Sequence, residues 1–128
     1  MSDNQGARQR LRYELLTIGL SDWVSMAEVM TAIQCYGLAE SIADKQHLVT
    51  SVIRSLLDDG LMSIGGLPDA GQIPSWGLSI DESMARLREA FIDNYDDRRS
   101  WDYSIWLGLT EAGRHVAQQL ADKAKAES

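Results

Sequence analysis

The chain lacks the features that mark several classes of protein. Its single cysteine, Cys35, cannot form a disulfide within the chain, so nothing indicates an oxidising compartment. No apolar run reaches the roughly 20 residues that a membrane-spanning helix needs. The first ten residues are polar and hold no apolar segment of the kind that a signal peptide requires. These absences predict a cytoplasmic protein.

Positive charge is also scarce. The chain has 12 Lys and Arg residues against 19 Asp and Glu residues, which gives a formal net charge of -7. An acidic surface repels phosphate backbones and attracts cationic partners over long range. The balance therefore argues against non-specific binding of nucleic acid, and leaves room for a local basic patch.

What the chain does have is enough apolar material for a core. It is 128 residues long, with 45% hydrophobic and 24% charged residues, which is ordinary for one globular domain. We expect a single domain over residues 1–128, with residues 1–7 frayed.

Apolar residues recur at helical spacing in five segments. Two of these segments begin with the capping-box pattern, in which a serine is followed three residues later by glutamate: Ser25 with Glu28, and Ser79 with Glu82. Asp44 and Thr110 are the expected N-caps of two others. The expected helices cover residues 8–19, 26–36, 45–57, 80–95 and 111–124. In the last of them we expect a buried stripe of Ala112, Val116, Leu120 and Ala124.

Two strands are expected between and after these helices. Residues 61–64 form a short apolar run, and apolar residues alternate with small or polar ones from Tyr103 to Leu109, which is the period of a strand. The sequence between them, from Gly65 to Ser79, is rich in Gly and Pro and is expected to be irregular.

Two stretches resemble winged helix-turn-helix proteins. Residues 48–64, LVTSVIRSLLDDGLMSI, are similar to the third helix and first strand of that fold, and residues 103–117, YSIWLGLTEAGRHVA, to its second wing strand and following helix. Thr110 and Gly113 recur at this junction in MarR-like and PadR-like regulators. The resemblance implies an α+β, mostly helical winged-helix domain with a small two- or three-stranded sheet. Here residues 65–102, with a helix of their own, replace the usual tight hairpin between the wing strands.

The resemblance implies that the third helix would read DNA. With its apolar face inward, the outward residues are His47, Thr50, Ser51 and Arg54, and Lys45 lies near the helix start as a further candidate DNA contact. Arg and Thr side chains contact bases or phosphates in a major groove. Asp58 shares this face and Asp59 follows it, so an ordinary solvated helix surface is favoured over a DNA contact.

A surface for a protein partner is the competing hypothesis. Trp76 and Trp101 lie in expected loops, near the acids Asp93, Asp96 and Asp97. Exposed Trp marks protein interfaces. The alternative, in which both indoles close the insertion over the domain, stays open. The expected helix within residues 65–102 carries an apolar stripe formed by Ile80, Met84, Leu87, Phe91 and Tyr95. Core packing is the favoured role of this stripe, and a homodimer interface remains an alternative.

Catalytic and metal-binding groups are few. His47 and His115 lack ligand spacing, and the aspartates after residue 92 lack the glycine of a calcium loop. We expect no cofactor, no metal and no enzyme activity. The sequence favours a non-catalytic binding module whose partner is another protein, such as a basic protein masked by an acidic immunity-type protein, or a regulatory partner. The alternative is a DNA-binding transcriptional regulator, and a small enzyme comes third.

Overall fold

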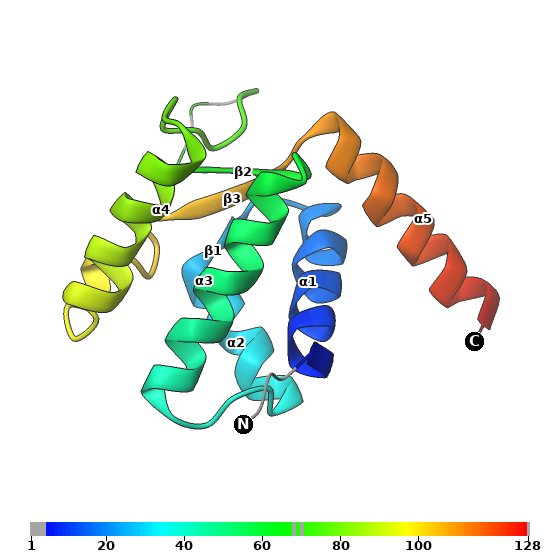
Figure 1. Cartoon of the computed structure of the whole chain (residues 1–128). Coiled ribbons are helices and arrows are strands. Elements are labelled where there is room, and N and C mark those ends of the chain that lie inside the picture. Colours follow the sequence, from blue (N-terminus) through cyan, green and yellow to red (C-terminus); the bar gives the residue numbers. More distant parts are fainter. Residues whose placement is uncertain (1–4, 68, 70, 128) are drawn as a thin grey trace.

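The structure, a computed structural model, describes residues 5–67, 69 and 71–127. Within these residues the fold is α+β and mostly helical, as expected (Figure 1). Residues 1–7 were expected to be frayed. Residues 5–7 instead belong to the first helix, and residues 1–4 lie outside the described part. The elements are α1 (Gln5–Gly19), β1 (Val24–Ser25), α2 (Met26–Tyr36), α3 (Ile42–Asp58), β2 (Met62–Gly65), α4 (Ile80–Arg88), the π-helix η1 (Glu89–Asp93), the 3₁₀ turn η2 (Arg98–Ser100), β3 (Trp106–Leu109) and α5 (Glu111–Glu127).

Local capping signals set most helix starts. Both predicted capping boxes are present: the Glu28 N–H donates to Ser25 Oγ over 3.2 Å, and the Glu82 N–H donates to Ser79 Oγ over 3.1 Å. The prediction that Asp44 caps α3 is wrong. The N-cap is Ser41, whose hydroxyl accepts from the Asp44 N–H over 3.0 Å. Asp44 therefore lies inside the first turn, where its charge meets the positive end of the helix.

The described strands form a three-stranded antiparallel sheet in the order β1-β3-β2. Val24 pairs with Leu107 in β3, and Ile64 pairs with the same residue from the other side. The expected strand from Tyr103 is shorter than predicted, because the chain turns before Trp106 and the Trp106 indole N–H donates to the Tyr103 carbonyl over 2.8 Å. β1 was not predicted, since two residues carry no periodic signal.

The junction of β3 and α5 is held to the end of α3. The Thr110 hydroxyl donates to the Gly60 carbonyl over 2.6 Å and accepts from the Gly113 N–H over 3.0 Å. The Thr110 N–H donates to the Leu61 carbonyl over 3.0 Å. A Cβ at Gly113 would overlap that same carbonyl. Thr110 and Gly113 are thus explained by backbone packing at this junction.

The remainder of α5 is less buried than expected. The helix packs on α1 near its start and diverges from the rest of the molecule towards the C-terminus (Figure 1). Its buried residues are Gly113 and Ala117, whereas Ala112 and Ala124 are exposed and Val116 and Leu120 are half-buried. The predicted stripe was therefore displaced by about one residue, because the helix turns its small residues, not its larger apolar ones, towards the neighbouring backbone.

The insertion between β2 and β3 packs closely against the domain. Its first part runs along the outer edge of β2, where Ser63 Oγ donates to the Pro74 carbonyl over 2.6 Å and the Trp76 N–H donates to the Ile64 carbonyl over 3.0 Å. Its helix α4 then packs against α3. Met84, Leu87 and Phe91 are fully buried. This confirms core packing for these three residues of the predicted stripe, whereas Ile80 and Tyr95 at its ends are partly buried against the core.

Candidate functional site

Helix α3 carries the predicted DNA-contact residues. It lies between α1 and α4 and packs against both (Figure 1). His47 is exposed, and Ser51 and Arg54 are partly exposed, as the helical pattern predicts. Thr50 contradicts the prediction, because it is only 8% exposed and its hydroxyl donates to the Gln46 carbonyl over 2.9 Å. The Gln46 amide, one turn earlier, donates to the Phe91 carbonyl over 3.3 Å, so the insertion covers this side of α3.

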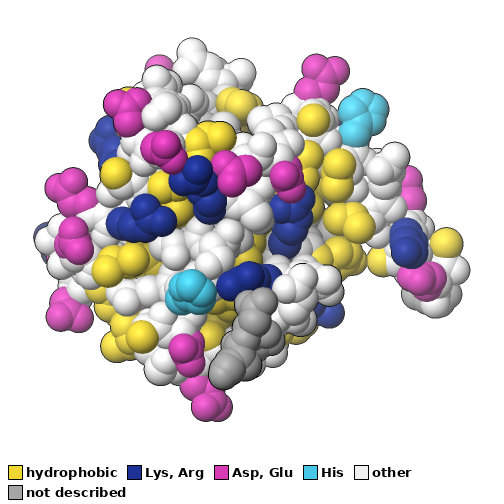
Figure 2. All heavy atoms as spheres, viewed as in Figure 1, with side chains coloured by type: hydrophobic (Ala, Val, Ile, Leu, Met, Phe, Trp, Pro, Cys, Tyr) yellow, Lys and Arg dark blue, Asp and Glu magenta, His cyan; other side chains and the backbone are white. Residues whose placement is uncertain are grey.

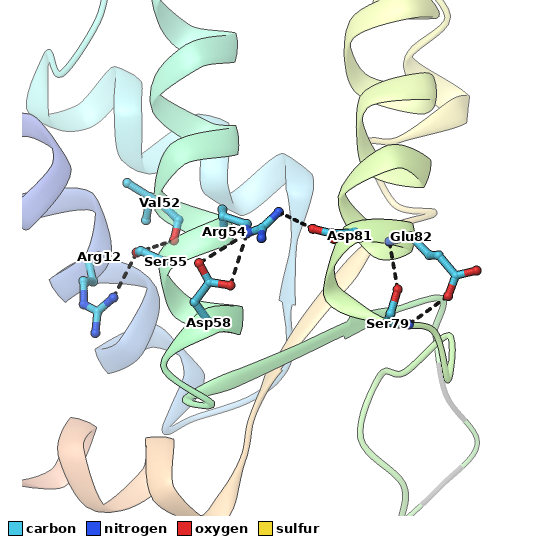
Figure 3. A network of polar contacts seen from close by, with 8 residues as sticks. All are labelled: Arg12, Val52, Arg54, Ser55, Asp58, Ser79, Asp81 and Glu82. Carbon is cyan, nitrogen blue, oxygen red and sulfur yellow. Dashed lines mark hydrogen bonds and ion pairs between the residues drawn. The ribbon is translucent and has the colours of Figure 1, made fainter.

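Arg54 lies within an acidic environment (Figure 3). Its Nε is 3.1 Å from Asp58 Oδ1 on the same helix, and its Nη1 is 2.9 Å from Asp81 Oδ1 on α4. Hydrogen bonds to Asp58 and then to Asp81 raise the pKa of Arg54 above its usual value. The guanidinium therefore joins α3 to the insertion, and its charge is balanced by two carboxylates.

The neighbouring cation on α1 is paired in the same way. Arg12 Nη2 lies 2.7 Å from Asp59 Oδ2. The Arg12 Nη1 also donates to Ser55 Oγ over 2.9 Å, a contact that can be followed in Figure 3. On the face of the molecule that carries α1, α3 and α4, Lys and Arg side chains alternate with Asp and Glu side chains (Figure 2). This face does not offer the continuous basic patch that phosphate binding uses.

The five residues predicted for a protein-partner surface do not form one surface. The prediction that Trp101 contacts a partner is wrong, because its side chain is only 2% exposed. Its indole N–H donates to the Tyr95 carbonyl over 3.0 Å, and its ring centre lies 4.9 Å from that of Phe91. Trp101 thus closes the end of the insertion over the core. Trp76 is partly buried, with the Arg86 guanidinium 4.6 Å from its ring centre.

The three predicted acids remain together on the surface. Asp93, Asp96 and Asp97 are all exposed; Asp93 is the last residue of η1, and Asp96 and Asp97 follow within four residues. Trp76 precedes α4, so the length of α4 and η1, about 20 Å at helical rise, separates it from them along the insertion. We call these three residues the acidic turn.

A cavity of about 340 Å³ lies between α2 and the segment that follows η1. Two hydrogen bonds bring these segments together: the Met26 N–H donates to the Ile105 carbonyl, and the Ala27 N–H to the Asp102 carbonyl. Lys45, predicted to face DNA, lines this cavity. The full lining is Ala27, Met30, Thr31, Gln34, Lys45, Tyr95, Asp96, Arg98 and Trp101.

Sequence reasoning missed the cavity as a site. Its walls come from residues 27–45 and 95–101, and no spacing within either segment indicates that they meet. Candidate site residues of the lining had been assigned to separate surfaces: Lys45 to a DNA contact, and Asp96 and Trp101 to a protein-partner surface.

Other chemistry is limited in the described part of the chain. No three His, Cys, Asp or Glu side chains there are placed to hold a metal ion, and none of the helices is both long and apolar enough to cross a membrane. No protein-family model matches the chain, and no curated protein or solved structure is significantly similar to it.

Proposed function

We propose that this chain is a non-catalytic binding module whose partner is a protein with a basic surface. The observation that carries the proposal is the pairing of Arg54 with both Asp58 and Asp81. Arg54 is the cation best placed on the exposed face of α3, and it is engaged within the molecule. Cys35, the single thiol, fits a reducing compartment such as the cytoplasm.

DNA is disfavoured as the partner by charge and by shape. A phosphate that approached Arg54 would also meet Asp58 and Asp81, and would have to compete with both carboxylates for the guanidinium. The major groove is about 12 Å wide and admits one helix. Because α3 packs between α1 and α4, a groove would have to accept its neighbours as well.

The acidic turn is the surface that we assign to the basic partner. Only Asp97 of its three carboxylates has a side-chain hydrogen bond within the described residues, from Ser100 Oγ over 3.1 Å. Two large apolar side chains close by in sequence add contact area: Ile92 is 36% exposed and Tyr103 is 66% exposed. Unpaired acids attract a basic surface over long range, and exposed tyrosine is enriched at protein interfaces.

The test compares two doubly substituted proteins of equal net charge. In Asp93→Asn/Asp97→Asn the acidic turn loses two charges; in the control, Asp122→Asn/Glu127→Gln, the exposed end of α5 loses two. Proteins captured from native extract by the wild type would be purified and titrated against all three forms. We expect a basic partner whose affinity falls at least about tenfold with the first variant and little with the control. Equal losses, or a captured partner indifferent to both, would contradict the proposal.

A winged-helix transcriptional regulator is the second candidate. The observation in its favour is the order of elements, in which three helices precede β2 and an antiparallel β3 leads directly into α5. This is the order that the resemblance implied, and a homodimer would be the form that binds. The measurement is a titration with genomic DNA fragments at physiological salt. Specific, saturable binding that Arg54→Ala abolishes would replace the protein-binding proposal with this one.

A further inference from the structure

The cavity beside α2 has two opposite charges on its walls that are not paired with each other. Lys45 comes from the first turns of α3 and Asp96 from the turn after η1. Within the described residues, no ion pair or side-chain hydrogen bond engages the Lys45 ammonium or the Asp96 carboxylate. Because neither charge has a partner within the described residues, both are available to a ligand that enters the cavity.

The third charged group of the cavity is already engaged. The Arg98 Nη2 donates to Asp102 Oδ1 over 3.3 Å, and the guanidinium lies 5.2 Å from the Trp101 ring centre. Arg98 therefore contributes a wall and no unpaired charge. One cation and one anion are left.

We propose that this cavity binds a small zwitterion of the free α-amino acid class. The ligand's carboxylate pairs with the Lys45 ammonium, and its ammonium group pairs with the Asp96 carboxylate. A ligand with both charges pairs with both side chains, whereas a simple anion or cation leaves either Asp96 or Lys45 without a partner.

The rest of the lining suits such a ligand. The volume of about 340 Å³ is at the lower end of the range of small-molecule sites. Met30 and the Tyr95 and Trp101 rings, which stack with centres 5.3 Å apart, supply an apolar wall for a side chain. The Gln34 amide has no hydrogen-bond partner among the described residues, and it lines the same space as a donor and an acceptor.

An irregular backbone directly precedes the site. The π-helix η1 interrupts the helical path of α4 just before Tyr95 and Asp96. Single π-turns are uncommon and occur frequently at functional sites. Here the wider turn ends with the Asn94 amide donating to the Glu89 carbonyl over 2.8 Å, and the chain then enters the cavity wall.

This inference does not rest on the proposed function. Asp96 belongs both to the acidic turn and to the cavity wall, but the acidic-turn test changes Asp93 and Asp97, neither of which lines the cavity. Either can fail while the other holds.

The experiment uses chemically capped ligands as probes of each charge. The standard L-amino acids are first screened at millimolar concentration for a rise in the unfolding midpoint of the full chain. The best of them is then titrated by calorimetry beside its N-acetyl form, which lacks the ammonium group, and its amide, which lacks the carboxylate. We expect each capped form to bind at least about tenfold more weakly, as the loss of one charge-assisted hydrogen bond predicts.

Substitutions then assign each charge to a residue. In Lys45→Met the free amino acid and its amide should bind equally, while the preference over the N-acetyl form is kept. In Asp96→Asn the free amino acid and its N-acetyl form should bind equally, while the preference over the amide is kept. Asp122→Asn and Lys123→Met, two exposed positions on α5 outside the cavity lining, are matched controls, and both should bind as the wild type does.

This pattern separates charge recognition from a general structural defect, which would weaken all three ligands together. The proposal is overturned if no amino acid binds at millimolar concentration, if the capped forms bind as tightly as the free one, or if each substitution affects both capped forms alike.

Discussion

Replacing Gly113 with alanine tests how α5 is joined to the domain. The added methyl group would overlap the Leu61 carbonyl oxygen and lie 2.8 Å from the Leu61 carbonyl carbon. Both atoms are backbone, so no side chain can swing away. The first turn of α5 must move, and the hydrogen bonds of Thr110 to Gly60 and Leu61 lengthen as it does.

The magnitude follows from three contributions. Overpacking in a close backbone contact costs about 1–3 kcal/mol. Weakening one or two hydrogen bonds costs about 1 kcal/mol each. Alanine offsets about 1 kcal/mol of this, because it favours the helix more than glycine does. The net expectation is a loss of about 1–4 kcal/mol in the free energy of unfolding. In thermal unfolding this corresponds to a fall of at least about 3 °C in the midpoint temperature.

The assay is urea unfolding followed by tryptophan fluorescence and by circular dichroism. Gly6→Ala in α1 is the matched control, since no atom of the described residues lies within 4 Å of a Cβ built there. It should leave stability unchanged or raise it by up to about 1 kcal/mol. If Gly113→Ala is as stable as the wild type, the close contact at this junction does not exist in solution.

Three further predictions concern the packing of the insertion, the cap of α4 and folding without a metal ion. Phe91→Ala should lower the free energy of unfolding by about 3–5 kcal/mol, because the ring is fully buried against Trp101, and an unchanged urea midpoint would contradict this packing. Ser79→Ala removes the hydroxyl that accepts from the Glu82 N–H and should cost about 1 kcal/mol, measured in the same way; a neutral result would mean that the α4 cap contributes nothing. Folding should need no metal, so a strong chelator should leave the thermal midpoint unchanged, and a clear drop would refute that expectation.

Local signals predicted the helices well. The two serine-glutamate capping boxes mark helix starts in the structure, because each acts within four consecutive residues and needs no tertiary partner. The start of α3 was misplaced although its signal was present. Ser41 and Asp44 have capping-box spacing themselves, and giving the cap to the acid overlooked the serine three residues earlier.

Features that depend on distant segments were not predictable from local patterns. Thr50 has the spacing of an outward residue but is buried. Gln46 one turn before it and Arg54 one turn after it both bond the insertion, which therefore lies along this side of α3. Trp101 could close the core or face solvent, and its ring contacts with Phe91 and Tyr95 decide the matter. Lys45 was predicted as a DNA contact near the start of α3, and its position on the cavity wall depends on residues some fifty positions later.

The position of β3 in the sheet also bears on the order in which the chain can fold. Among the described residues, β1 and β2 each pair with β3 alone, and β3 is the last of these three strands to be synthesised. Residues 66–105 separate the paired ends of β2 and β3. Closing a loop about tenfold longer than a four-residue hairpin costs about 2 kcal/mol more in chain entropy. On the ribosome, helices α1 to α3 can therefore form early, while the β2 edge stays unpaired until nearly the whole domain has emerged. A chain stalled before Trp106 would expose that edge, and we expect such truncated chains to aggregate.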